Sequence, residues 1–282
     1  MRHRPISEFL LPSKENTDWQ AVSAVRLQFG YFIMKKILHS DIERLLVFFL
    51  FSFFIIFCSE KTREAKRTQL FPELREKYPI WGIDVSHYQG KIDWKKTKGS
   101  GLRFAYIKAT EGTDFVDSRF ERNWKDAKRL GVPRGAYHFY RLCKDAKKQA
   151  ANFIRTVPAE FSSLPPVIDL ELHKNCSKPP NRDAFLRDLK KFSKLLEKEY
   201  EKKPILYVIW DFYEKYLIGE VNDFSLWISD PWGHEEPVLP EVRKWTLWQY
   251  DYKGRLKGIS GDVDLNFFNG DEEQFQKFLH SR

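Results

Sequence analysis

Two carboxylates, two residues apart, close a short apolar run in the middle of the chain. The run covers residues 166–172 and reads Pro-Val-Ile-Asp-Leu-Glu-Leu. In an extended strand, residues i and i+2 point to the same side, so we expect Asp169 and Glu171 to share one face, roughly 6–7 Å apart along the strand. When two carboxyl groups lie close together in an apolar setting, the pKa of one of them is raised. Such a carboxylic acid stays protonated near neutral pH and can act as a general acid.

Two further acids lie inside apolar runs. Asp84 belongs to Gly-Ile-Asp-Val at residues 82–85, and Asp264 belongs to Asp-Val-Asp-Leu at residues 262–265. Either one alone would be read as an ion pair or a strand end, but four buried acids converging on one site are costly unless they are used. Glycoside hydrolysis needs a proton donor and a second carboxylate that stabilises positive charge at the sugar carbon. The set therefore predicts an enzyme that cuts glycans.

Other polar residues near these runs are predicted to hold the site in place and not to react. Lys108 and Glu111 are predicted to form an ion pair that holds the site rather than reacts. His138 is predicted to be a core or positioning residue, because no Ser or Cys nucleophile motif accompanies it. A metal site built from the acids is the weaker interpretation, since they come without clustered histidines. We expect neither a metal nor a cofactor.

Eight short apolar runs, rich in β-branched and aromatic residues, predict strands in the C-terminal two thirds of the chain. They are 82–85, 103–109, 134–140, 166–172, 204–210, 224–229, 245–250 and 262–267. Amphipathic patterns predict helices over 117–130, 144–156 and 181–202, whereas the last connections look too short or irregular for full helices. This order predicts an α/β fold, a compact, modified TIM-like β/α barrel of eight strands. A doubly wound open sheet is the alternative, but no Gly-rich phosphate loop follows the first strand.

In such a barrel, the catalytic residues lie at the C-terminal ends of the strands. The sequence places its polar and aromatic candidates there: Asp84, Glu111, Tyr137, His138, Asp169, Glu171, Trp248 and Gln249, with Asp264 inside the eighth run.

Composition excludes some classes of protein. The net charge of +9 over 282 residues suits an anionic polymer or a membrane surface. No basic cluster is interleaved with aromatic residues, so we expect no nucleic-acid partner. Aromatic residues make up 16% of the chain and include nine Trp, which suits contacts with sugar rings as well as a large core.

The N-terminal part predicts export. Residues 45–58 contain no charge and are too few for a typical membrane span of about 20 residues, which favours a signal peptide or an N-terminal anchor. Met34-Lys35-Lys36 resembles the start of a bacterial signal peptide, so residues 1–33 are interpreted as a mis-assigned extension. Cys58 is a lipidation candidate, although Phe57 departs from that pattern. We expect a signal or anchor at 34–58, a polar linker at 59–79 and a catalytic domain at 80–282, secreted or tethered to the membrane of the cell envelope.

The remaining cysteines leave two alternatives open. Cys143 and Cys176 would form a disulfide if the domain is exported, or they would be two unrelated thiols. No pair of cysteines has metal-ligand spacing.

Several segments together resemble the family 25 glycoside hydrolases, the lysozymes of the Chalaropsis type. The resemblance covers residues 81–268 and rests on 82–90 (Gly-Ile-Asp-Val-Ser-His-Tyr-Gln-Gly), 105–112 (Ala-Tyr-Ile-Lys-Ala-Thr-Glu-Gly) with Phe115 and Asp117, 134–139 (Arg-Gly-Ala-Tyr-His-Phe), Asp169-Leu170-Glu171, and Trp248-Gln249-Tyr250 with Gly258, Gly261, Asp264 and Asn266.

The resemblance implies a β-1,4-N-acetylmuramidase that cuts peptidoglycan glycan strands between N-acetylmuramic acid and N-acetylglucosamine, as a monomer and without a cofactor. It implies that Glu171 is the general acid/base and that Asp169 stabilises an oxazolinium formed by the substrate's acetamido group. Asp84 and Asp264 would line the same cleft, and one of them has been considered the nucleophile in this family. Substrate-binding residues are then expected among Lys108, Glu111, Tyr137, Tyr207, Trp248, Gln249 and Asn266.

One departure and two other functions stay open. Where the family commonly reads Trp-Ile-Ala-x-Tyr, residues 227–232 read Trp-Ile-Ser-Asp-Pro-Trp, which affects contacts on that side of the cleft. A catalytically silent wall-binding barrel and a chitinase-like hexosaminidase are the alternative functions, and a covalent or a substrate-assisted mechanism would use the same residues.

Overall fold

The computed structural model describes residues 50, 52, 73–173, 175–220, 222–231, 234–237 and 244–281. The chain divides into two compact units, Met1–Glu64 and Ala65–Arg282, and the fold below is that of the second. The expectations of a start at Met34, an export signal at 34–58 and a lipidated Cys58 lie outside the described residues, Leu50 and Ser52 apart. Within the described residues, no helix combines the length and the apolar character that crossing a membrane requires.

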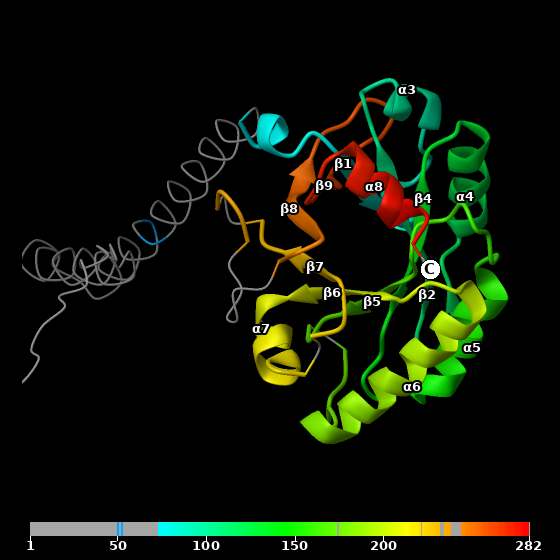
Figure 1. Cartoon of the computed structure of the whole chain (residues 1–282), viewed down its shortest axis with the longest axis vertical. Coiled ribbons are helices and arrows are strands. Elements are labelled where there is room, and N and C mark those ends of the chain that lie inside the picture. The colour runs from blue at the N-terminus through cyan, green and yellow to red at the C-terminus, as the bar shows by residue number, and fades with distance from the viewer. Residues whose placement is uncertain are drawn as a thin grey trace, which may run out of the picture. The chain divides into compact units, whose positions relative to one another are not determined.

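Eight strands close into a barrel in the order β1-β2-β4-β5-β6-β7-β8-β9, with β9 returning to β1 (Figure 1). Neighbouring strands run parallel except at β9, which is antiparallel to both β8 and β1. A two-residue strand, β3, forms a hairpin on β2. The strands are β1 Trp81–Val85, β2 Phe104–Glu111, β3 Phe115–Val116, β4 Arg134–Phe139, β5 Val167–Leu170, β6 Ile205–Ile209, β7 Leu226–Ser229, β8 Leu247–Gly254 and β9 Val263–Phe268.

Each of the eight predicted runs supplies one barrel strand, so the predicted β/α barrel is confirmed. Two differences matter for the site. The run at 166–172 forms a strand only over Val167–Leu170, which leaves Glu171 just beyond the strand. The last strand is antiparallel, so the start of β9, and not its end, lies at the same barrel end as the C-terminal ends of the other strands.

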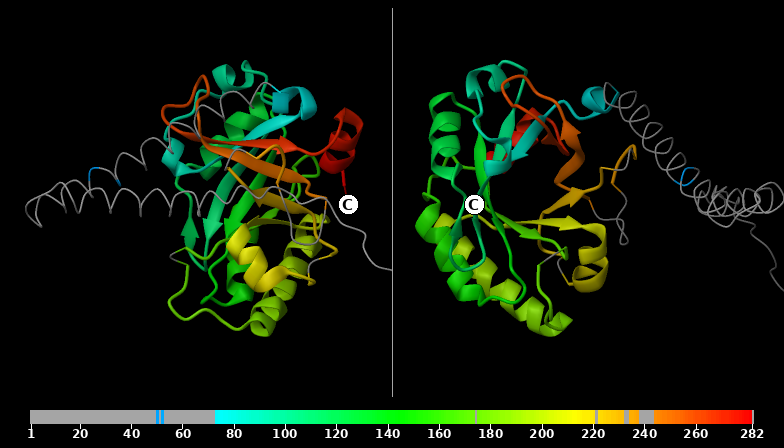
Figure 2. Two further views of the ribbon diagram at one scale, coloured as in Figure 1. Left: turned by 90° about the vertical axis from the view of Figure 1, so that its left-hand side faces the viewer. Right: turned by 180° about the vertical axis from the view of Figure 1, so that it is seen from behind.

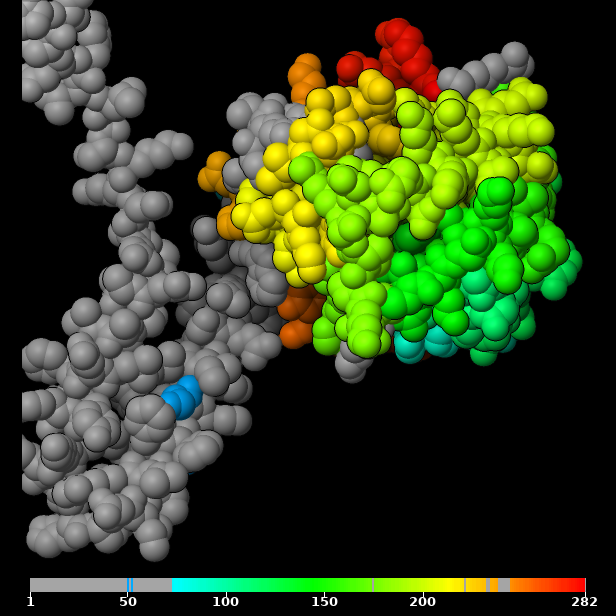
Figure 3. Space-filling model, turned by 90° about the horizontal axis from the view of Figure 1, so that it is seen from below, coloured from blue at the N-terminus to red at the C-terminus, as the bar shows by residue number. Residues whose placement is uncertain are grey.

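Three helices lie along one side of the barrel in chain order: α4 Phe120–Arg129, α5 Ala146–Thr156 and α6 Arg182–Tyr200 (Figures 1 and 2). Asp145 caps α5 and Asn181 caps α6, each through its side chain. Seen from below, α6 lies between α5 and the segment that holds α7 Trp210–Phe212 and η2 Tyr213–Leu217 (Figure 3). The three predicted helices are therefore present, each starting one to three residues later than predicted. The sequence did not predict α7, η2, the short α3 Trp94–Lys98 or α8 Glu272–Leu279.

The inside of the barrel has its own apolar core, separate from the core between strands and helices. Its members alternate along the strands, and α8 adds Phe275 and Leu279. Phe275 packs against Phe104 at the start of β2 and Phe268 at the end of β9, so α8 closes the barrel end opposite the carboxylates. The interior residues are Ile80, Phe104, Tyr106, Leu164, Val167, Ile205, Tyr207, Trp227, Leu247, Phe268, Phe275 and Leu279.

Two glycines make room for these interior rings. A Cβ at Gly82 would lie 2.5 Å from the ring of Phe104, and a Cβ at Gly135 would lie 2.2 Å from the ring of Tyr106. Such contacts are far inside van der Waals distance, so both strands need glycine where the large rings fill the barrel.

The segment before β1 belongs to the barrel unit. Leu74 and Tyr78 are buried, and the Tyr78 ring contacts Trp245, Trp248 and Phe267. The end of the predicted polar linker at 59–79 is thus packed onto the catalytic domain.

Candidate active site

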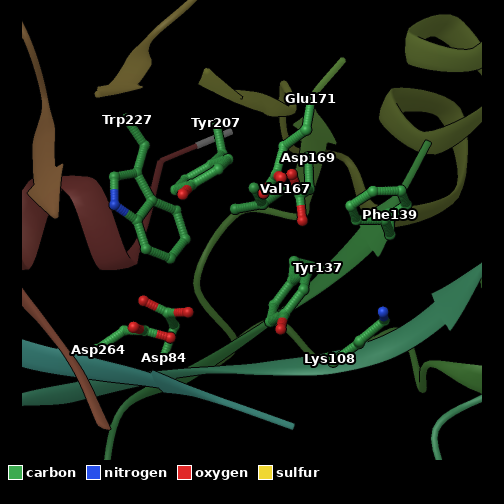
Figure 4. Close-up of a pocket in the computed structure, with 10 residues that line it drawn as sticks. All are labelled: Asp84, Lys108, Tyr137, Phe139, Val167, Asp169, Glu171, Tyr207, Trp227 and Asp264. Carbon is green, nitrogen blue, oxygen red and sulfur yellow. The ribbon is translucent and has the colours of Figure 1, made fainter. Parts of the chain in front are cut away.

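A cavity of about 150 Å³ opens at the carboxyl end of the parallel strands (Figure 4). Its floor is shared with the interior core through Val167, Tyr207 and Trp227. The lining residues are Asp84, Lys108, Tyr137, Phe139, Val167, Asp169, Glu171, Tyr207, Trp227 and Asp264. All four acids singled out in the sequence therefore line one cavity.

Strand geometry explains why the acids converge. Val167, Asp169 and Glu171 follow the two-residue alternation of β5, and all three line the cavity. Asp84 on β1 and Asp264 on β9 are direct partners in the antiparallel pairing, which puts both side chains on the same face. Because β9 is reversed, an acid near its beginning reaches the same barrel end as acids near the ends of β1 and β5.

Asp169 and Glu171 form the first carboxyl pair, at the end of β5. Burial and the neighbouring Glu171 charge raise the pKa of Asp169 well above its usual range. Burial also raises the pKa of Glu171. Asp169 Oδ1 is buried and has no hydrogen-bond partner among the described residues. The pair consequently holds a proton near neutral pH.

Asp84 and Asp264 form the second pair, on the other side of the cavity (Figure 4). Burial, followed by the charge of Asp84, raises the pKa of Asp264 to about 9. Burial also raises the pKa of Asp84, but two amide hydrogen bonds oppose this shift. We infer that Asp264 carries the proton of this pair and that Asp84 is the group stabilised as an anion.

Gln249 and Asn266 hold Asp84. Gln249 Nε2 donates to Asp84 Oδ2 at 3.1 Å, and Asn266 Nδ2 donates to the same oxygen at 2.8 Å. The opposite ends of both amides accept hydrogen bonds, from Tyr207 and Ser229 at Gln249 Oε1 and from Trp227 at Asn266 Oδ1. Neither amide is among the residues that line the cavity, and the contacts shown here hold Asp84 in place; sugar binding by Gln249 and Asn266 stays a prediction.

Lys108 and Glu111 form the predicted ion pair, with 2.8 Å between Lys108 Nζ and Glu111 Oε2. Residues three apart in a regular strand face opposite sides, but the register of β2 shifts between Lys108 and Thr110. The extra residue turns Lys108 and Glu111 to the same side. Lys108 lines the cavity, whereas Glu111 lies behind it and also binds Arg141 at 3.0 Å.

His138 is a fully buried positioning residue. Its Nδ1 lies 2.7 Å from Thr110 Oγ1, and its Nε2 lies 3.2 Å from Gln149 Oε1. Burial lowers the pKa of His138 to about 3, so the ring is neutral and bridges β2, β4 and α5.

Of the three aromatic residues predicted to contact sugar, two line the cavity and one does not. Tyr137 and Tyr207 line the cavity, as predicted, and burial raises the pKa of both well above the usual range, so both hydroxyls stay protonated. Trp248 does not line it. Since Gln249 points into the barrel, its neighbour Trp248 points outward, where its Nε1 donates to Asp230 O at 3.0 Å and its ring packs on Trp245.

Trp227 occupies the position at the cavity that was predicted for Trp248. It is 1% exposed, lines the cavity and stands at 87° to the ring of Tyr207. The alternation Trp227, Ser229 along β7 was the signal that could have found it. The departure at 227–232 also has a structural consequence, because the Ser229 hydroxyl donates to Gln249 Oε1 at 2.8 Å.

A closed β/α barrel with two buried carboxyl pairs at its mouth has the acids that glycoside hydrolysis requires. Residues 83–259 match the family described as Glycosyl hydrolases family 25. The chain belongs to this family.

Several known proteins are similar to the chain over most of its length. "Uncharacterized protein YegX" of Escherichia coli O157:H7 is 36% identical over 207 residues, which cover 72% of this chain and 74% of that protein. "Lysozyme M1" of Streptomyces globisporus is 34% identical over 204 residues, or 68% of each chain. The solved structure of a family 25 glycosyl hydrolase from Bacillus anthracis is 41% identical, with a TM-score of 0.67, covering 71% of this chain and 93% of that one.

Proposed function

We propose that the protein is a peptidoglycan muramidase that hydrolyses the β-1,4 linkage between N-acetylmuramic acid and N-acetylglucosamine. The observation that carries the proposal is the convergence of Asp84, Asp169, Glu171 and Asp264 on one cavity in a member of family 25. One of the proteins to which the chain is similar is named as a lysozyme. No cofactor is needed, because acids alone supply proton transfer and charge stabilisation.

We assign proton transfer to Glu171. The Asp169–Glu171 pair holds a proton, and Glu171 lies at the mouth, one residue beyond the end of β5. The single proton of the pair moves fully onto Glu171 and from there to the leaving oxygen as the glycosidic bond breaks, so Glu171 ends this step as a carboxylate. Asp169 then becomes the anion beside the positive charge that develops at the sugar carbon. In the second half of the reaction, Glu171 accepts a proton from the attacking water.

The second pair supplies a fixed negative charge. Two amide donors hold Asp84 Oδ2, so its position does not depend on substrate. Asp84 is buried, and an oriented, buried anion stabilises positive charge more strongly than the same anion would in bulk solvent. Tyr137 and Tyr207, neutral and rigid, would line the walls against the sugar rings.

Product analysis tests the substrate assignment. Purified peptidoglycan is digested with the enzyme, and the products are reduced and analysed by mass spectrometry. We expect muramic acid at the new reducing ends. Glucosamine at those ends would instead identify a chitinase-like hexosaminidase, and binding without any new reducing end would identify a silent wall-binding barrel.

We also propose that the enzyme is exported and acts in the cell envelope, attached through its N-terminal segment. The uncharged run at 45–58 and a disulfide between Cys143 and Cys176 support export, because disulfides persist in oxidising compartments. Expression in bacteria with labelled palmitate tests the anchor. We expect membrane-bound, labelled protein that loses the label in Cys58→Ser. Unlabelled protein that begins at residue 1 and stays in the cytoplasm would refute both export and the anchor.

A further inference from the structure

The side chain of Asn175 lies in the connection between β5 and α6 and makes three short hydrogen bonds. It is 8% exposed. Its Nδ2 donates to Tyr140 O at 2.7 Å and to Glu171 O at 2.8 Å. Its Oδ1 accepts from Leu142 N at 2.7 Å. Both amide hydrogens and the amide oxygen are therefore engaged by backbone groups.

These backbone groups belong to two different connections. Tyr140 and Leu142 follow β4, while Glu171 follows β5. The pairing of β4 with β5 reaches Phe139 and Asp169, and Tyr140 N still donates to Asp169 O at 3.0 Å. Beyond this point Asn175 replaces the strand pairing, because it bonds to both chains where they leave the sheet. The backbone that carries Glu171 is thereby joined to the connection after β4.

A covalent bond joins the same two connections one residue further on. Cys143 and Cys176 form a disulfide with 5.5 Å between their Cα atoms. Arg141 adds a hydrogen bond from its guanidinium to Asn175 O at 3.3 Å and an ion pair with Glu111 at 3.0 Å. The bond therefore holds Asn175 at the place where its amide reaches Glu171 O, next to the ion pair behind Lys108.

We propose that Asn175 is a positioning residue for Glu171, and that the Cys143–Cys176 disulfide keeps it in position, so that reduction of this bond lowers turnover while the barrel stays folded. The inference rests on the proposed role of Glu171 as proton donor. Asn175 has no place among the cavity-lining residues, and it acts on the reaction only through the backbone of Glu171. A shift of the proton donor by about 1 Å is enough to lower the rate about 100-fold.

The first test compares Asn175→Ala with Asn123→Ala. Asn123 is also buried and bonded through its side chain, to Trp94 on the outer side of the barrel. For Asn175→Ala we expect kcat to fall about 10- to 100-fold with KM within about twofold, and the pH profile to shift because the environment of Glu171 changes. Asn123→Ala should lower the melting temperature and leave kcat, KM and the pH profile as in wild type.

The second test concerns the disulfide. Wild type is reduced with a phosphine under native conditions, and free thiols are counted by alkylation and mass spectrometry. We expect kcat to fall as thiols appear, toward the value of the Cys143→Ser/Cys176→Ser double variant, whose activity should not respond to the phosphine. Circular dichroism should show folded protein throughout.

The outcomes separate this inference from the proposed function. If Glu171→Gln is inactive while Asn175→Ala keeps wild-type kcat and pH profile, positioning by Asn175 is wrong and the role of Glu171 stands. If the fully reduced enzyme and the double variant keep wild-type kcat, the disulfide has no part in positioning. If Glu171→Gln itself keeps its activity, both the proposed role of Glu171 and this inference fail.

Discussion

Asp264 is the residue whose protonation most directly links the site to stability. Its pKa is about 9 in the folded protein, against an ordinary value of 3.8. A raised pKa means that the folded state binds a proton that the unfolded state has released. Stability from this group is therefore fully present below about pH 4 and is lost as the pH rises toward 9.

Asp264→Asn should remove this dependence, because the amide is neutral at every pH and can still hydrogen-bond to Asp84. We expect the melting temperature of the variant to exceed that of wild type at pH 8 and to differ little from it at pH 4. Each kcal/mol regained corresponds to about 2–4 °C for a domain of this size. Melting curves at both pH values check this, and an equal difference between the proteins at pH 4 and pH 8 would contradict the assignment of the proton.

At the scale of the element, β8 carries two neighbouring side chains with opposite tasks. Gln249 points inward to Asp84, and Trp248 points outward into the core beside Tyr78 and Trp245. Gln249→Ala should lower kcat by about 10- to 100-fold, because Asp84 loses an oriented donor. Trp248→Phe should keep kcat and lower the free energy of unfolding by about 1–2 kcal/mol. Kinetics and urea unfolding measure both, and the reverse pattern would show that the faces of β8 are assigned wrongly.

The sequence pattern of a strand predicts which side chains point inward only where its two faces differ in polarity. Alternation along β5 was sufficient to place Asp169 and Glu171 together, since both are polar in an apolar run. The run at 245–250 is apolar on both faces, so it could not tell Trp248 from Gln249 in orientation. A strand buried on both faces also carries no signal for its direction, so the reversal of β9 came only from the structure. The helix α8 did leave a signal, the capping box of Asp271 and Gln274.

At the scale of the whole molecule, closure of the barrel depends on a filled interior. Gly135→Ala would place a Cβ 2.2 Å from the ring of Tyr106, which also donates from its hydroxyl to Pro165 O at 3.2 Å. We expect a loss of about 1–3 kcal/mol in the free energy of unfolding. Gly99→Ala is the matched control, since its Cβ would meet only atoms at 3.4 Å and its φ is −61°. Equal stabilities for the two variants in urea unfolding would contradict the interior packing described above.

Proton transfer by Glu171 is tested most directly by the initial rate of reducing-end release from purified peptidoglycan. Glu171→Gln is compared with Glu273→Gln, which makes the same chemical change at an exposed carboxylate of α8. We expect a loss of about 10²- to 10⁴-fold for Glu171→Gln, which circular dichroism should show to be folded, and no loss for Glu273→Gln. A Glu171→Gln enzyme whose rate is within about tenfold of the wild-type rate would contradict the assignment of Glu171 as the proton donor, because general acid catalysis by this group would then contribute too little.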